Sequence, residues 1–81
     1  MDGEVEVEIV FYVTSRIIKS VKVPIAELKQ DGEGLYNWDE IEKLAALKGK
    51  AELKAEGVKY VYIEFSDSEL VSRPEWFDYN I

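Results

Sequence analysis

Residues 4–14 read EVEVEIVFYVT, and this stretch decides the fold. Apolar side chains occupy every odd position from Val5 to Val13, while glutamates occupy the first three even positions. Successive side chains of a β-strand point to opposite faces, so this alternation predicts a strand with one buried and one exposed face. We therefore expect residues 4–14 to lie in an antiparallel sheet that is covered on one side.

A second strand is expected directly after the first. Residues 15–16 can form a turn, and residues 17–23 are rich in β-branched side chains, which favour strands. Pro24 has no N–H for a sheet ladder and should end this strand or lie at a sheet edge. A short helical turn over 24–30 and a glycine-containing loop over 31–34 are predicted next.

A helix is the other well-marked element. Asn37 stands three residues before Glu40, a pattern close to a capping box. Apolar residues then follow at helical spacing, which predicts a helix over 38–48 with Gly49 as its C′ residue.

The segment after Gly49 is ambiguous. Residues 51–56 alternate as a strand does, although their composition favours helix. We prefer a strand here, because Glu56-Gly57 can turn it directly into residues 58–65, whose composition is typical of a strand. The expected order is ββαββ, or ββαβ if the helix continues through Gly49. The fold class is therefore α+β, with one main helix and a small antiparallel sheet of three to four strands.

The chain is short enough for one domain only. Its 81 residues lie near the lower limit for a single hydrophobic core. Residues 1–65 are expected to form this α+β domain. Residues 66–81 lose the periodic pattern and carry Pro74 next to several aromatic residues, which predicts an aromatic and acidic C-terminal tail or loop packed on the domain.

Composition argues against most enzymatic chemistry. The chain has no histidine and no cysteine, so the usual general base, thiol nucleophile and transition-metal ligands are missing. The pairs Asp67 with Glu69 and Asp39 with Glu40 fit a turn and the first turn of a helix better than a catalytic dyad. We therefore expect that the protein is not an enzyme and that it has no catalytic residues, no cofactor and no metal.

Charge indicates the kind of partner. Seventeen acidic residues against ten basic ones give a net charge of -7, which disfavours direct binding of nucleic acid or an anionic membrane. A protein partner with a basic surface is the better match. The acidic N-terminus argues against a signal peptide, and the lack of a long apolar run argues against a membrane span. We therefore expect a cytoplasmic protein.

Two sets of residues are the candidates for partner binding. The first set is a row of carboxylates on one strand face, spaced about 6.8 Å apart, which is similar in regularity and sign to a row of backbone phosphates. The alternative is a solvated strand face kept acidic to prevent edge pairing. The second set lies near the C-terminus, where aromatic side chains favour binding hot spots. The candidates are Glu4, Glu6 and Glu8 in the row and Asp67, Glu69, Trp76, Phe77, Asp78 and Tyr79 near the C-terminus.

The leading hypothesis is a small acidic inhibitor or adaptor that covers a basic, nucleic-acid-handling surface of a partner protein. In size and charge the chain is similar to phage-encoded anti-CRISPR and anti-restriction proteins, although it shares no motif with them. One alternative is an assembly module that forms a homodimer through a strand edge or the aromatic tail. A carboxylate-based enzyme is a third hypothesis and would need two acids facing one pocket.

Overall fold

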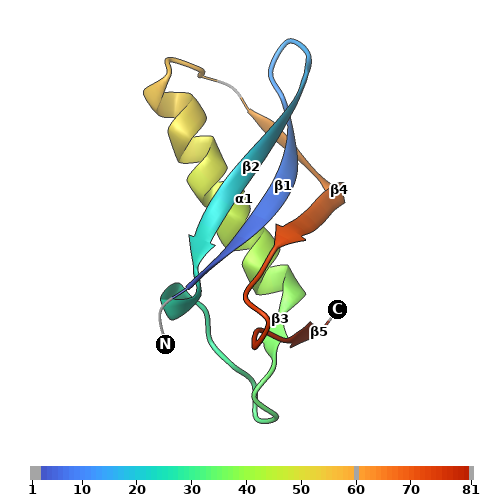
Figure 1. Ribbon diagram of the computed structural model, residues 1–81. Coiled ribbons are helices and arrows are strands. Elements are labelled where there is room, and N and C mark those ends of the chain that lie inside the picture. The colour runs from blue at the N-terminus through green and yellow to red at the C-terminus, as the bar shows by residue number, and fades with distance from the viewer. Residues whose placement is uncertain (1–2, 60, 81) are drawn as a thin grey trace.

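One long α-helix packs across a small antiparallel sheet (Figure 1). In this computed structural model, residues 3–59 and 61–80 are described, apart from the side chains of residues 65–67. The elements in chain order are β1 (Glu4–Tyr12), β2 (Arg16–Pro24), the 3₁₀ helix η1 (Ile25–Glu27), β3 (Tyr36–Asn37), α1 (Trp38–Ala55), β4 (Tyr62–Ser72) and β5 (Tyr79–Asn80). The α+β fold class is confirmed. When the two-residue strands β3 and β5 are set aside, the order is ββαβ, the alternative expected if the helix continues through Gly49.

The first strand is the centre of the sheet. The sheet order is β2-β1-β4, so β1 has a neighbour on each side. It pairs with β2 without a register shift, from Glu4 opposite Pro24 to Tyr12 opposite Arg16, which confirms the predicted hairpin. The strand ends at Tyr12, two residues before the predicted end, and Val13 in the turn is 38% exposed where the alternation placed it inside.

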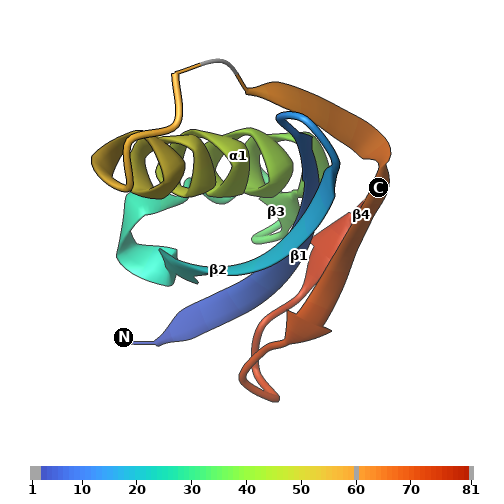
Figure 2. The same ribbon diagram turned by 90° about the horizontal axis from the view of Figure 1, so that it is seen from above.

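The hydrophobic core lies between α1 and one face of the sheet. Figure 2 shows the sheet curving around the helix, with α1 against its concave side. The odd-numbered side chains of β1 all face this side and are fully buried, as the alternation predicts. They meet apolar side chains of β2, α1 and the C-terminal segment in one cluster, whose members include Val5, Val7, Ile9, Phe11, Val21, Val23, Ile41, Ala45, Leu53 and Phe77.

The helix is longer than predicted, and the strand expected over 51–56 is wrong. Helix α1 runs through Gly49 to Ala55. Gly49 is a packing residue and not a C′ residue, because a Cβ atom at this position would lie 2.5 Å from Cζ of Phe11. A glycine in mid-helix costs helix propensity, and here it lets the helix approach the sheet closely.

Helix α1 ends at Ala55, seven residues after the predicted end, and a glycine cap follows it. Gly57 has φ +95 and donates its N–H to the carbonyl of Lys54, while Val58 donates to Leu53. These two bonds form a Schellman motif, which satisfies carbonyls that a helix end leaves without partners. The Glu56-Gly57 pair therefore ends a helix and does not turn one strand into another.

The start of α1 agrees with the prediction. The side chain of Asn37 accepts hydrogen bonds from the N–H groups of Asp39 at 2.8 Å and Glu40 at 3.4 Å, so Asn37 is the N-cap. The capping box is not closed in the usual way. The carboxylate of Glu40 accepts instead from the N–H of Lys29 at 3.2 Å, which fastens the segment after η1 to the first turn of the helix.

The last strand of the main sheet starts later and runs further than predicted. Residues 58–65 were expected to form it, whereas β4 spans Tyr62–Ser72. The predicted boundary between domain and tail at residue 65 therefore falls inside a strand. Residues 66–72 belong to the sheet.

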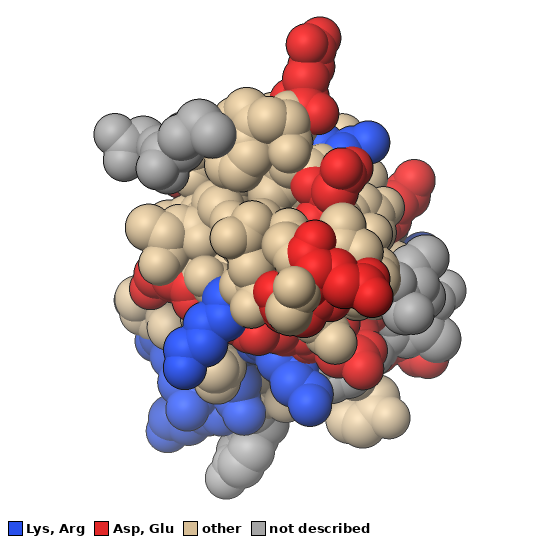
Figure 3. All heavy atoms as spheres, turned by 90° about the horizontal axis from the view of Figure 1, so that it is seen from below, with Lys and Arg blue, Asp and Glu red and all other residues tan. Residues whose placement is uncertain are grey.

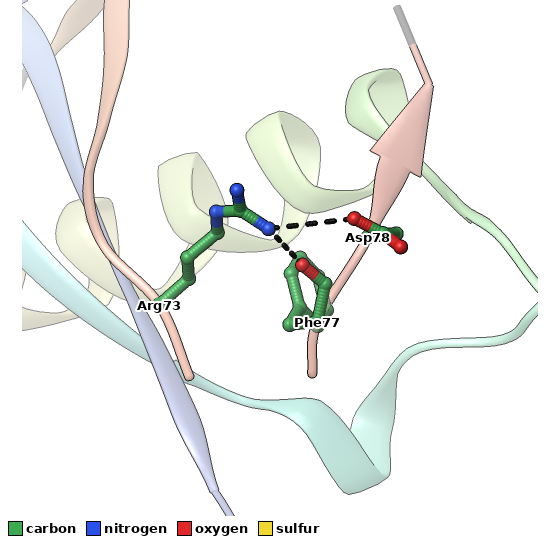
Figure 4. Close-up of polar contacts among 3 residues, drawn as sticks. All are labelled: Arg73, Phe77 and Asp78. Carbon is green, nitrogen blue, oxygen red and sulfur yellow. Dashed lines mark hydrogen bonds and ion pairs between the residues drawn. The ribbon is translucent and has the colours of Figure 1, made fainter. Parts of the chain in front are cut away.

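The remaining C-terminal residues are also built into the fold. Strand β5 pairs with β3 in parallel, next to the N-terminus of α1. Phe77 is fully buried and stacks on Tyr36, with ring centroids 4.6 Å apart. Arg73 fixes the turn between β4 and β5, because its guanidinium donates to the carbonyl of Phe77 and lies 3.6 Å from the carboxylate of Asp78 (Figure 4). No helix in the described part of the chain combines the length and apolar character needed to cross a membrane.

Candidate functional site

The sheet face that points away from α1 is the main candidate for binding. In Figure 2, none of the helices and strands of the described residues packs over this convex face. Glu4, Glu6 and Glu8 project from it, because their neighbours in β1 face the core. The alternative function as edge protection does not apply to the folded chain, since β1 is the central strand and has no free edge.

An irregularity in β4 adds another glutamate to this face. Glu8 lies opposite Glu69 and Val10 opposite Glu64, so residues 65–68 of β4 match Ile9 alone. Residues directly opposite each other in an antiparallel pair share a face. Glu69 and Glu64, five positions apart, therefore both lie on the face of Glu8, which simple alternation along β4 forbids.

Four carboxylates of this face form no ion pair among the described residues, although Lys22 of β2 lies directly opposite Glu6. Within residues 3–59 and 61–80, Glu4, Glu6, Glu8 and Glu69 form no hydrogen bond or ion pair through their side chains. We call these four residues the acidic face. Glu8 and Glu69 stand directly opposite each other, a placement of like charges that is unfavourable in an isolated protein and is relieved by a cationic partner.

Other acidic residues have structural tasks. Glu27 lies 3.0 Å from the amine of Lys48, and Glu52 lies 3.1 Å from that of Lys19. Glu42 accepts a hydrogen bond from Ser68, and Asp78 pairs with Arg73. The acidic stretch over 27–42 is largely used within the fold, whereas the acidic face on β1 and β4 is not.

Asp31 is the clearest case of a structural carboxylate. One oxygen accepts the N–H groups of Leu35 at 3.0 Å and Glu33 at 2.8 Å, and the other accepts from Asn80 at 3.1 Å. The hydrogen bond from Leu35, followed by that from Glu33, lowers the pKa of Asp31 below its ordinary value of 3.8. The carboxylate joins the loop after η1 to β5.

This lowered pKa predicts an acid-sensitive contribution to stability. Because the folded-state pKa is below the unfolded value, the contribution is complete above the unfolded pKa and is lost as the pH falls through the folded pKa. We expect Asp31→Asn to be less stable than wild type at neutral pH and equally stable at about pH 2, measured by urea unfolding. Glu33→Gln, in the same loop, is the control and should show no such convergence.

The predicted C-terminal candidates are distributed over different environments. Phe77 is buried and offers no surface to a partner, so the expectation that it contacts one does not fit the fold. Trp76 is 40% exposed, and the side chain of Asp78 is 75% exposed. Tyr79 is half-buried, with its ring 5.6 Å from that of Trp38. The side chain of Asp67 lies outside the described residues.

The structure brings two of the predicted residues together. Glu69 and Tyr79 line one surface pocket of about 330 Å³, together with Trp38, Ser68 and Leu70. A second pocket of about 230 Å³ lies beside Glu4, Glu6 and Lys22. Both pockets border the acidic face. They form depressions large enough to receive side chains of a bound protein.

Charge is unevenly spread over the surface. Figure 3 shows the end of the molecule with β3 and β5, where Asp and Glu cover the upper and right parts and Lys and Arg gather at the lower left. In the described part of the chain, no group of three or more acidic side chains is arranged to hold a metal ion.

Sequence reasoning missed Glu64 and the unpaired state of the row. Glu64 reaches the convex face through the irregular pairing of β4, for which the sequence carries no clear signal. No family model matches this chain, and no similar protein is found among curated proteins or solved structures.

Proposed function

We propose that this chain is a non-enzymatic binding domain whose acidic face covers a basic, nucleic-acid-handling surface of a partner protein. The observation that carries the proposal is a set of four carboxylates that form no ion pair or hydrogen bond among the described residues. They lie on a sheet face over which no described helix or strand packs. A basic partner removes the repulsion among them and gains fast association through complementary fields. A cytoplasmic location is part of the same proposal.

The position of the row on the central strand suits this role. Glu6 and Glu8 are paired with strands on both sides and Glu4 is paired with β2, so their spacing of about 6.8 Å is preset. Such preorganisation lowers the entropy lost on binding. A regular line of negative charge on a stiff strand is a reasonable substitute for the phosphate line of a nucleic acid.

Self-association through a strand edge has less support. Of the two edge strands of the main sheet, β2 and β4, β2 carries Arg16, Lys19 and Lys22 and no acidic residue. Two copies that paired along β2 would bring these like charges together, and lysines on edge strands oppose such pairing.

The proposal predicts that neutralising the row abolishes partner capture. Changing Glu4, Glu6 and Glu8 to glutamine should raise the Kd for the partner by about tenfold or more, because each charge pair contributes up to about 1 kcal/mol. The measurement is capture from cell lysate on immobilised wild-type and variant chains. Captured proteins are then eluted with salt and, separately, with duplex DNA.

The matched control changes Glu33, Glu56 and Glu75 to glutamine, which removes the same net charge from exposed positions elsewhere. We expect this control to retain the partner, and we expect duplex DNA to displace the partner from wild type. Equal loss in both triple variants would show an effect of net charge alone. A partner that neither salt nor duplex DNA elutes would contradict the proposal. It would also be contradicted if the wild type sedimented as a stable dimer and the captured protein were a second copy of this chain.

A further inference from the structure

A second surface, far from β3 and β5, gathers basic and aromatic side chains. The C-terminal end of α1, the β1–β2 hairpin and the start of β4 lie at the same end of the molecule (Figure 1). Between them is an open cleft of about 350 Å³. We call it the lysine cleft, and its lining residues are Tyr12, Val13, Lys50, Lys54, Lys59, Val61 and Tyr62.

The charge of the lysine cleft is opposite to that of the whole chain. Among the described residues, three lysines line it and no acidic residue does, although acids outnumber bases in the chain by seventeen to ten. Lys50 and Lys54 come from one helix face, and Lys59 comes from the segment that follows the helix. Among the described residues, none of the three forms an ion pair, in contrast to Lys19 and Lys48.

The helix end explains only part of this cluster. Lys54 lies in the last turn of α1, where a cation interacts favourably with the helix dipole. Lys50 lies before that turn, and Lys59 lies beyond the helix. Bringing the three amines together without a counter-charge is unfavourable, and an anion in the cleft removes that cost.

The aromatic side chains add a second recognition element. Tyr12 and Tyr62 are opposite each other in the sheet, with ring centroids 6.3 Å apart and planes at 48°. Tyr62 is 68% exposed, so much of its ring is free to contact a ligand. Exposed aromatic rings beside cations are the combination that stacks nucleobases and holds their phosphates.

We propose that the lysine cleft binds a nucleotide, with the phosphates among Lys50, Lys54 and Lys59 and the base against Tyr62. The cleft volume lies in the range of small-molecule sites, which begins at roughly 300 Å³. The same chemistry is offered by a free nucleotide and by a short single strand. The net charge of -7 favours the free nucleotide, because it repels a long polyanion. This site is distinct from the acidic face and stands or falls without it.

The test is a titration of the ¹⁵N-labelled full chain followed by NMR. ATP should shift the amide signals of residues that line the lysine cleft and leave those of the acidic face unchanged. Tripolyphosphate, which lacks a base, should bind at the same place at least about fivefold more weakly. An oligothymidylate of eight nucleotides distinguishes a strand from a free nucleotide: ATP binding more tightly supports the proposal as stated, and tighter strand binding would overturn its choice of a free nucleotide.

Variants separate the cleft from general electrostatics. Lys54→Glu combined with Lys59→Glu should raise the Kd for ATP by about tenfold or more. The control, Lys29→Glu, reverses an exposed charge near the first turn of α1 and should change the Kd by less than about twofold. Tyr62→Ala should weaken ATP binding and leave tripolyphosphate binding unchanged. All of these side chains are at the surface, so the dispersion of the NMR spectrum should be kept.

Three results would overturn the proposal. They are ATP shifts outside the cleft, an equal effect of the Lys29 variant, and tighter binding of a polyglutamate peptide than of ATP. The last result would assign the cleft to acidic peptides.

Discussion

Replacing Phe77 with alanine is expected to lower the free energy of unfolding by about 3–5 kcal/mol. Phe77 is fully buried, stacks on Tyr36 and lies edge-on to Trp76 at a centroid distance of 6.2 Å. Its removal leaves a cavity between the C-terminal segment and the core. Urea unfolding followed by circular dichroism measures the loss.

The control is the neighbouring Trp76, which is 40% exposed. Its replacement by alanine should lower the free energy of unfolding by less than half as much as Phe77→Ala. For a domain of this length the total stability is about 4–12 kcal/mol, so the Phe77 variant can lie close to unfolding. Phe77→Leu keeps most of the volume and provides a measurable intermediate. Equal losses at both positions would mean that the buried position of Phe77 contributes no more to stability than the half-exposed position of Trp76.

Replacing Gly49 with valine is expected to destabilise the fold by about 2–3 kcal/mol, through overpacking. Even alanine should destabilise it, although alanine in an exposed mid-helix position gains about 1 kcal/mol over glycine. The reason is the distance of 2.5 Å from an added Cβ to Cζ of Phe11, a fully buried ring that has little room to move. Thermal and urea unfolding of both variants measure the effect.

A double-mutant cycle identifies the cause. Phe11→Leu shortens the side chain that the new Cβ meets, so the loss in Gly49→Ala combined with Phe11→Leu should be smaller than the sum of the two single losses. A strictly additive result would place the strain elsewhere. Stabilisation by Gly49→Ala alone would contradict the close packing of α1 on the sheet.

The fold could be predicted where local pattern and tertiary environment agree. The alternation and the N-cap at Asn37 both describe requirements of a single element. The alternation is confirmed over 4–12, and so is the N-cap. The helix end at Gly49 was predicted wrongly, because the sequence alone does not distinguish a glycine needed for close packing from one that ends a helix. Only the contact with Phe11, far away in sequence, distinguishes the two cases.

The candidate site was predictable in part. The row of glutamates follows from strand periodicity, whereas the position of Glu69 opposite Glu8 depends on four residues of β4 matching one of β1. Whether the carboxylates form ion pairs depends on the positions of all the lysines in the fold, which local sequence does not reveal. The lysine cleft joins residues from β1, α1, β4 and the segment before β4, so no local motif marks it.

The sheet order has a consequence for synthesis of the chain on the ribosome. Strand β1 emerges well before its second neighbour, β4, which follows only after about fifty further residues have been made. Until then one side of a nine-residue apolar-rich strand is open to pairing with other nascent chains. Glu4, Glu6 and Glu8 make such pairing electrostatically unfavourable during this interval. The glutamates that we propose as a binding surface in the finished protein thus also oppose mispairing while it is being made.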